Sequence, residues 1–270
     1  MRKFLNNLTG IWQKKALRIE KRFRFVISAI ILSLLMLVST FFLFEKAIIF
    51  SLLFFVLGYL LTYFSLLEGI ERVEWITLFL MPIILTLSFY LFYFLFPVRW
   101  LTRLPFIVLY GISIYAVLLC SNIFNVGVEK SIQLYRAAFS INFFYQLVVS
   151  FLFNNALFSF KLHFIFNGLL IFLTAFLLGF QLIWTVKLDL RIDKKTIVYG
   201  FFIALVLAEL TLVGSFLPLK STVLALFLAS SYYSLSGLIY NYLDERLFKE
   251  TVREYISVWI VVLVITLLSL

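Results

Sequence analysis

Four polar side chains recur at every fourth residue of one long apolar stretch, namely Asn142, Gln146, Ser150 and Asn154. At about 100° per residue these positions drift by about 120° around a helix and form a slowly turning polar seam. Amides that faced lipid would lack hydrogen-bond partners, so we expect the seam to face other helices or a wet cavity. Two interpretations stay open: interhelical hydrogen bonds that fix the packing, and the lining of a solute pathway.

A single acidic residue, Glu209, lies well inside another apolar stretch, twelve residues beyond Ile197. That separation is about 18 Å along a helix, slightly past the middle of a bilayer. An ionised carboxylate facing lipid there would cost about 2.5 to 3.5 kcal/mol, so we expect Glu209 to be protonated or to find donors within the bundle. The expected donors are Asn142, Gln146, Asn154, Tyr232 and Tyr233. The site would then either pin helix packing or couple a proton or cation to function.

The composition of the chain requires a membrane protein. Of its 270 residues 64% are apolar and 13% are charged, whereas about 25% of a soluble domain is charged. One cysteine, Cys120, and one histidine, His163, exclude an internal disulfide, zinc sites of Cys and His clusters and bis-His haem, and we expect no cofactor. The net charge of +10 is placed at the ends of apolar stretches, which favours anionic lipid over nucleic acid as a partner.

Nine apolar stretches approach the length that crosses a hydrocarbon core about 30 Å thick. Backbone groups must be paired in lipid, so we predict an all-α, polytopic transmembrane helical bundle. The predicted spans are Phe25–Phe44, Ala47–Leu67, Trp75–Phe96, Leu104–Phe124, Phe139–Phe158, Phe164–Val186, Ile197–Leu219, Ser221–Tyr242 and Ile256–Leu270. The last is short, so we expect it to thin the bilayer or to recruit residues before Ile256.

The distribution of Lys and Arg predicts a cytoplasmic N-terminus. With that orientation 18 of the 23 basic residues fall in inner segments and 5 in outer ones. Residues 1–24 form a basic segment whose apolar residues recur at helical spacing, from Leu5 to Phe23. This pattern is typical of an amphipathic helix that lies on anionic lipid, although the charges alone would also serve to set orientation. Residues 25–270 form the transmembrane domain.

Small residues indicate where helices approach closely. The seventh span carries Gly200, Ala204 and Ala208, and we expect its mate to be the eighth span, which carries similar residues from Ala225 to Gly237. The sixth span repeats the pattern less densely.

Two acidic clusters follow the second and sixth spans, on the predicted cytoplasmic side. They contain Glu68, Glu71, Asp189 and Asp193. Paired carboxylates at helix ends can hold Mg²⁺ against a diphosphate, although neighbouring Arg and Lys residues allow simple solvated ion pairs. In outline this layout resembles intramembrane aromatic prenyltransferases, which implies prenyl transfer. The first motif of that family is rich in Asn and Asp, whereas this chain reads Glu-Gly-Ile-Glu-Arg-Val-Glu from residue 68.

Three further motifs resemble an uncharacterised family of multi-pass membrane proteins from candidate-phylum bacteria. They are Ser-Asn-Ile-Phe-Asn-Val at 121–126 with Arg-Ala-Ala at 136–138, Ala-Glu-Leu through Ser-Phe-Leu-Pro at 208–218, and Glu-Tyr-Ile-Ser-Val at 254–258. The resemblance covers residues 95–265 and implies a bacterial cytoplasmic membrane, with no assigned activity.

These patterns favour a non-enzymatic integral membrane protein, either a small-solute transporter or a component of an envelope complex with other membrane proteins. The alternative is a lipid-modifying enzyme of the prenyltransferase type that uses the cytoplasmic carboxylates. The sequence shows no clear inverted repeat, which weakens the transporter interpretation.

The topology predicts that residues 161 and 189 lie on opposite sides of the membrane. In intact cells an impermeant thiol reagent should label Lys161→Cys, whereas Asp189→Cys should react only after permeabilisation. The unmodified chain is the control, because its one cysteine lies in a predicted span. Labelling of both variants from the same side would contradict the topology.

Overall fold

The chain folds into long helices that run side by side. The computed structural model describes residues 19–67, 75–97, 99–126, 132–188 and 193–270. These residues form α2 (Lys21–Ser39), a 3₁₀ turn η1 (Leu43–Lys46), α3 (Ala47–Leu66), α4 (Trp75–Tyr93), α5 (Trp100–Val126), α6 (Ile132–Ser159), α7 (Phe164–Lys187), α8 (Lys194–Gly214), α9 (Ser221–Leu243) and α10 (Lys249–Leu268). Within these ranges nine helices are long and apolar enough to cross a membrane, and there is no strand. The all-α, multi-pass prediction is confirmed.

Helix boundaries differ from the predicted spans mainly at the ends. The last helix recruits about two turns before Ile256 and begins at Lys249, so its 20 residues can cross a bilayer. The first membrane helix begins at Lys21, so Arg24 belongs to it rather than to the N-terminal segment. Residues 1–18, which carry most of the predicted lipid-surface helix, lie outside the described residues.

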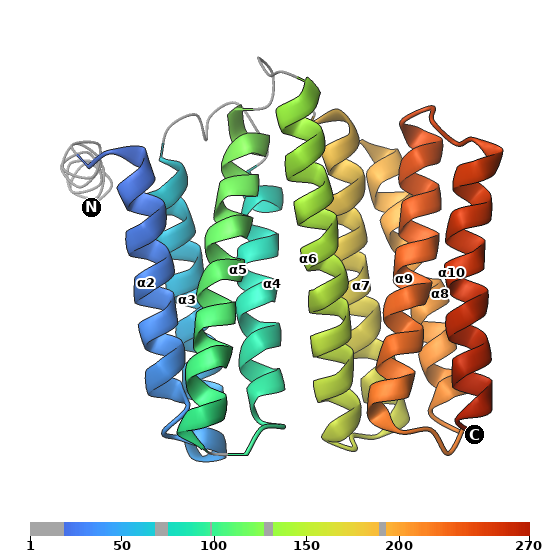
Figure 1. Ribbon diagram of the computed structural model, residues 1–270, viewed down its shortest axis with the longest axis horizontal. Coiled ribbons are helices and arrows are strands. Elements are labelled where there is room, and N and C mark those ends of the chain that lie inside the picture. Colours follow the sequence, from blue (N-terminus) through green and yellow to red (C-terminus); the bar gives the residue numbers. More distant parts are fainter. Residues whose placement is uncertain (1–18, 68–74, 98, 127–131, 189–192) are drawn as a thin grey trace.

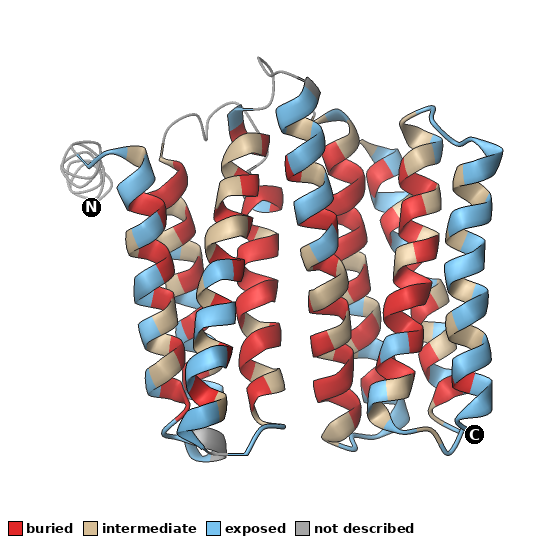
Figure 2. Cartoon of the chain, in the orientation of Figure 1, coloured by how far each residue is buried: buried red, intermediate tan, exposed pale blue. Residues whose placement is uncertain are grey.

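The helices stand in two rows (Figure 1). The front row is α2, α5, α6, α9 and α10, and the back row is α3, α4, α7 and α8. Each helix packs against its neighbours in the row and across it, except α10, which packs on α9 in its own row. We call the end where α2, α4, α6, α8 and α10 begin the first end of the bundle, and the opposite end the second end. The buried residues lie between the rows and between neighbouring helices (Figure 2).

The first eight membrane helices form two four-helix units that are wound alike. Helices α2, α3, α4 and α5 pass from front to back, along the back row and to the front again, and α6, α7, α8 and α9 repeat this path (Figure 1). In both units the first helix packs on the second and fourth, and the third on the second and fourth. The second unit covers the first through α6 and α7, which both pack on α4. Helix α10 follows α9 in the place where α6 follows α5.

The closest helix approach joins α7 to α8. A Cβ added at Gly200 of α8 would lie 3.2 Å from the backbone nitrogen of Phe180, and one added at Gly179 would lie 3.6 Å from the Cα of Gly200. The prediction that this stripe mates chiefly with α9 is therefore wrong. Small residues on α7, including Ala175, meet the stripe at the same level, so these two backbones can come together.

Helix α10 is held to the bundle by α9. Ser234 donates from Oγ to the carbonyl of Tyr255 over 2.9 Å, and Trp259 donates from Nε1 to Ser231 Oγ over 2.9 Å. Only 6% of the apolar stretch of α10 is buried, so these contacts carry most of its attachment. Gly237 faces the Tyr255 ring directly, because an added Cβ there would lie 2.3 to 2.8 Å from the ring edge and hydroxyl.

We predict that Gly237→Ala loosens α10 from α9. The added methyl group overlaps the Tyr255 ring, and overpacking of this kind costs about 1 to 3 kcal/mol. Thermal unfolding in detergent should show a lowered midpoint. The matched control is Gly58→Ala on α3, where the new Cβ meets Ile83 at an ordinary 3.6 Å. Equal midpoints for the two variants would contradict the prediction, and Tyr255→Leu should rescue the first variant only.

Candidate functional site

The half of the polar seam nearer the first end of the bundle, Asn142 and Gln146, belongs to a hydrogen-bond network that joins three helices. Gln146 of α6 is fully buried and donates from Nε2 to the carbonyl of Leu178 over 3.3 Å and to the Gln181 side chain on α7. Asn142 donates to the same Gln181 Oε1 over 3.1 Å. From α9, the Tyr232 hydroxyl donates to Gln146 Oε1 over 2.8 Å. The carboxamide of Gln146 therefore bonds to both neighbouring helices at once.

The four-residue spacing of α6 explains how these groups meet. Residues 142 and 146 share the face that lies between α7 and α9, while α7 contributes Gln181 at the same level. The sequence analysis missed Gln181, although an amide isolated in an otherwise apolar stretch is the signal that marks it. It also assigned Tyr232 to Glu209 instead of Gln146.

In the half of the seam nearer the second end, Ser150 and Asn154 bond to each other within α6. Asn154 is buried and donates from Nδ2 to Ser150 Oγ over 3.3 Å, within α6. Asn154 therefore does not join Asn142 and Gln146 in one network. The interhelical packing interpretation is supported at Asn142 and Gln146, where the amides bond across helices.

Glu209 lies apart from the network. Its side chain is exposed on α8, and it makes no hydrogen bond or ion pair with any residue that the structure describes. The prediction that it finds donors within the bundle is wrong, because α8 packs through the opposite face, which carries Gly200, Ala204 and Thr211. A packing pin at Glu209 would need a donor that the described bundle does not supply, and a proton- or cation-coupled role for Glu209 stays a prediction.

The depth of Glu209 also differs from the prediction. Helix α8 ends at Gly214, five residues later, which places the Glu209 backbone about 8 Å from the second end of the helix. In helices the Cα–Cβ bond tilts toward the helix N-terminus. The Cα–Cβ bond of Glu209 therefore tilts toward the middle of the span and away from the nearer end.

Among the predicted cytoplasmic carboxylates, only Asp193 falls within the described residues; Glu68, Glu71 and Asp189 lie outside them. Asp193 is the N-cap of α8 and accepts a hydrogen bond from the Lys195 backbone nitrogen over 3.4 Å. A pocket of about 140 Å³ beside it is lined by residues of both charges, including Lys187, Lys195 and Glu245. In the described ranges no three His, Cys, Asp or Glu side chains gather where a metal ion could bind.

Two arginines that the sequence analysis counted as boundary charges are buried in the first unit. Arg24 is fully buried in the first turn of α2. Arg103 donates from Nη2 to the carbonyl of Thr40, the C-cap of α2, over 3.3 Å, and its guanidinium lies 4.5 Å from the Phe41 ring centroid. A cation at a helix C-terminus complements the helix dipole, so Arg103 fixes the end of α2 against α5.

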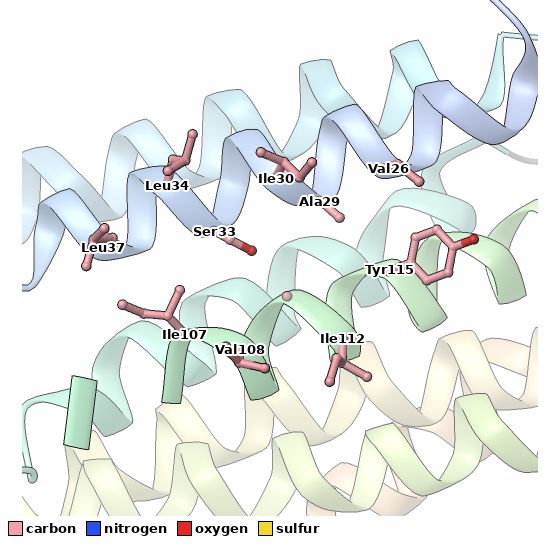
Figure 3. Close-up of a pocket in the computed structure, with 11 residues that line it drawn as sticks. Val26, Ala29, Ile30, Ser33, Leu34, Leu37, Ile107, Val108, Ile112 and Tyr115 are labelled. Atoms are coloured by element: carbon pink, nitrogen blue, oxygen red, sulfur yellow. The ribbon is translucent and has the colours of Figure 1, made fainter. Parts of the chain in front are cut away.

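Two grooves open on the outer surface of the bundle. The larger, about 470 Å³, lies between α2 and α5 and is almost wholly apolar, with the Ser33 side chain directed toward α5 beside Gly111 (Figure 3). The smaller, about 260 Å³, lies between α8 and α10 above α9. It is lined by Val206, Leu210, Ser231, Ser234, Leu235, Leu238, Ile256 and Trp259.

No known protein family, curated protein or solved structure matches the chain. The two family resemblances drawn from the sequence therefore stay predictions.

We predict that Gln146→Leu destabilises the bundle. The substitution leaves the Tyr232 hydroxyl without its acceptor in a buried site, and an unsatisfied group of this kind costs about 1 to 3 kcal/mol. Thermal unfolding in detergent should show a lower midpoint, part of which Tyr232→Phe in the same chain should restore. Asn154→Leu is the control, because its bond stays within α6. A Gln146 variant as stable as the Asn154 variant would contradict the packing role.

Proposed function

We propose that this integral membrane protein is a non-catalytic component of a membrane protein complex and binds its partner through the exposed face of α8. The observation that carries the proposal is Glu209, an exposed carboxyl on a membrane-spanning helix that has no partner among the described residues. Lipid chains offer no hydrogen-bond donor, so an ionised Glu209 at this depth is stabilised only by a group from outside the described bundle.

The position of Glu209 argues against simple contact with the membrane surface. Long side chains near helix ends can reach the interface, which removes the cost of placing them in lipid. The Glu209 side chain is shorter than that of Lys or Arg, and its Cα–Cβ bond tilts toward the middle of the span. The exposed residues around it on α8 are apolar, including Phe202, Leu205 and Val213. A partner protein that supplies a polar group to this face accounts for an acid held there.

The polar network supports a non-catalytic role in place of solute transport. A pathway along the seam would require Asn142 and Gln146 to give up the bonds that join α6 to α7 and α9. The enzyme alternative depends on carboxylates that are free to bind Mg²⁺, and Asp193 is engaged as a helix cap. The transport alternative would need groups that join the helices, and the one carboxylate of the enzyme alternative that the structure describes caps α8.

We propose further that the first end of the bundle faces the cytoplasm of a bacterial cell. Among the described residues this end carries most of the basic side chains, which is the arrangement that the positive-inside rule favours. The second end carries fewer, among them Lys161 and Lys220. Anionic lipid headgroups are the expected neighbours of the basic first end.

The complex is tested by the size of the native species. Membranes are solubilised in a mild detergent such as digitonin, and the tagged chain is followed by native electrophoresis. We expect a species larger than the 31.6 kDa chain in its detergent micelle, converted to the single chain by a harsher detergent. The chain purified to homogeneity in the harsh detergent gives the marker for the single species. A chain that migrates alone after mild solubilisation would contradict the proposed function.

A further inference from the structure

We infer that the groove between α8 and α10 binds one transmembrane helix of another protein, and that this helix carries a Lys or Arg side chain that pairs with Glu209. The inference deepens the proposed function and rests on it, because it names where the partner docks and by which chemistry. Its three supports are the repeated winding of the two units, the shape of the groove and the charge at its edge.

The repeated winding indicates a missing neighbour for α8. Helix α8 takes the same place in the second unit as α4 takes in the first (Figure 1). Helix α4 is covered by α6 and α7, and 72% of its apolar stretch is buried, against 33% for α8. Helix α10 packs on α9 as α6 packs on α5, but it does not pack closely on α8 as α6 packs on α4. The place that corresponds to α7, beside α8 and behind α10, is the one that a partner helix would take.

The groove is shaped for a helix at that place. It runs between Val206 and Leu210 of α8 and Ile256 and Trp259 of α10. Its floor on α9 includes Ser231, a small residue of the kind that lets a neighbouring helix approach closely. Because the Ser231 hydroxyl accepts a bond from Trp259, the floor and the α10 wall are fixed relative to each other before any partner arrives.

The charge at the edge of the groove specifies the chemistry of the partner. Glu209 does not line the groove, but it lies three residues after the groove residue Val206 and about 60° around α8 from it, so it flanks the path of an incoming helix. An acid in lipid is best stabilised by a cation that is desolvated together with it, and intramembrane acids characteristically pair in this way. A Lys or Arg at the same depth therefore fits, with apolar side chains above and below it to fill the groove.

A second copy of the chain does not supply this cation. Within the described helices, the basic residues lie within five positions of a helix end. At the second end, which is the end nearer to Glu209, the described basic residues are Arg103, which is buried against Thr40 and Phe41, and the exposed Lys46, Arg99, Lys161 and Lys220, which lie at the ends of helices and not at the depth of Glu209. The partner is accordingly assigned to a different protein.

The inference is tested by site-specific photo-crosslinking of the full-length chain in native membranes. A benzophenone amino acid replaces Val206 in the groove, and in a control it replaces Leu169, which is 59% exposed on α7. We expect an adduct from position 206 and none from position 169. The crosslinked peptide, sequenced by mass spectrometry, should be an apolar stretch of at least about 18 residues with a Lys or Arg inside it. Glu209→Gln should lower the adduct yield at least tenfold, and Glu209→Asp should retain most of it.

Each other outcome overturns a defined statement. Adducts of the chain with itself, an apolar peptide without a basic residue, or full adduct yield from Glu209→Gln would overturn the inference while leaving a complex intact. Equal adducts from both positions would place the partner on another face. A chain that migrates alone after mild solubilisation would remove the proposed function itself. Because Glu209 is exposed and makes no bond within the described bundle, its variants should unfold at the same temperature as the native chain, which separates lost docking from lost folding.

Discussion

Lipid supplies no hydrogen-bond partners, and this single constraint orders the whole bundle. Apolar contact alone does little to join helices in a membrane, because lipid chains are as apolar as Leu side chains. The helices are joined instead where backbones come close, as at Gly179 and Gly200, and where polar side chains bond across. The network around Gln146 is the strongest case, since one carboxamide holds α6 to two neighbours. The bonds of Ser231 and Ser234 do the same for α10.

Charge follows the same constraint at the ends of the helices. Arg103 is buried, yet its guanidinium meets a helix C-terminus, the Tyr93 hydroxyl and two aromatic faces. Every favourable partner for a cation is therefore assembled around it, which is what makes its burial tolerable. Glu209 shows the opposite case, a charged residue type that is exposed on a span and makes no hydrogen bond or ion pair with the described bundle. This contrast is why we interpret the exposed face of α8 as a binding surface for another protein.

The sequence was sufficient for the number of spans and for most of their ends. The bilayer fixes the length and hydropathy that a span must have, and both can be read along the sequence alone. It also identified Asn142 and Gln146 as inward-facing, since four-residue spacing places them on one face. It could not say which helix each face meets. The stripe at Gly200 was assigned to α9, and it packs on α7. Glu209 was placed among donors, although the packed face of α8 lies opposite to it. Such pairings depend on the order of helices in the rows, which hydropathy does not encode.

The arrangement of the helices in two rows explains why the face of α8 is exposed at one edge of the bundle. Each unit presents its third and fourth helices to whatever follows, and in the first unit α6 and α7 follow. Among the described helices, α10 packs on α9 and not closely on α8, so the face of α8 is left open. An open face of Leu, Val and Phe would be stable in lipid without any partner, and its exposure alone would argue nothing. The acid at position 209 changes this, because it is the one group on that face whose cost in lipid a protein neighbour removes. The open face of α8 and the presence of Glu209 on it therefore both indicate the same position for a partner helix.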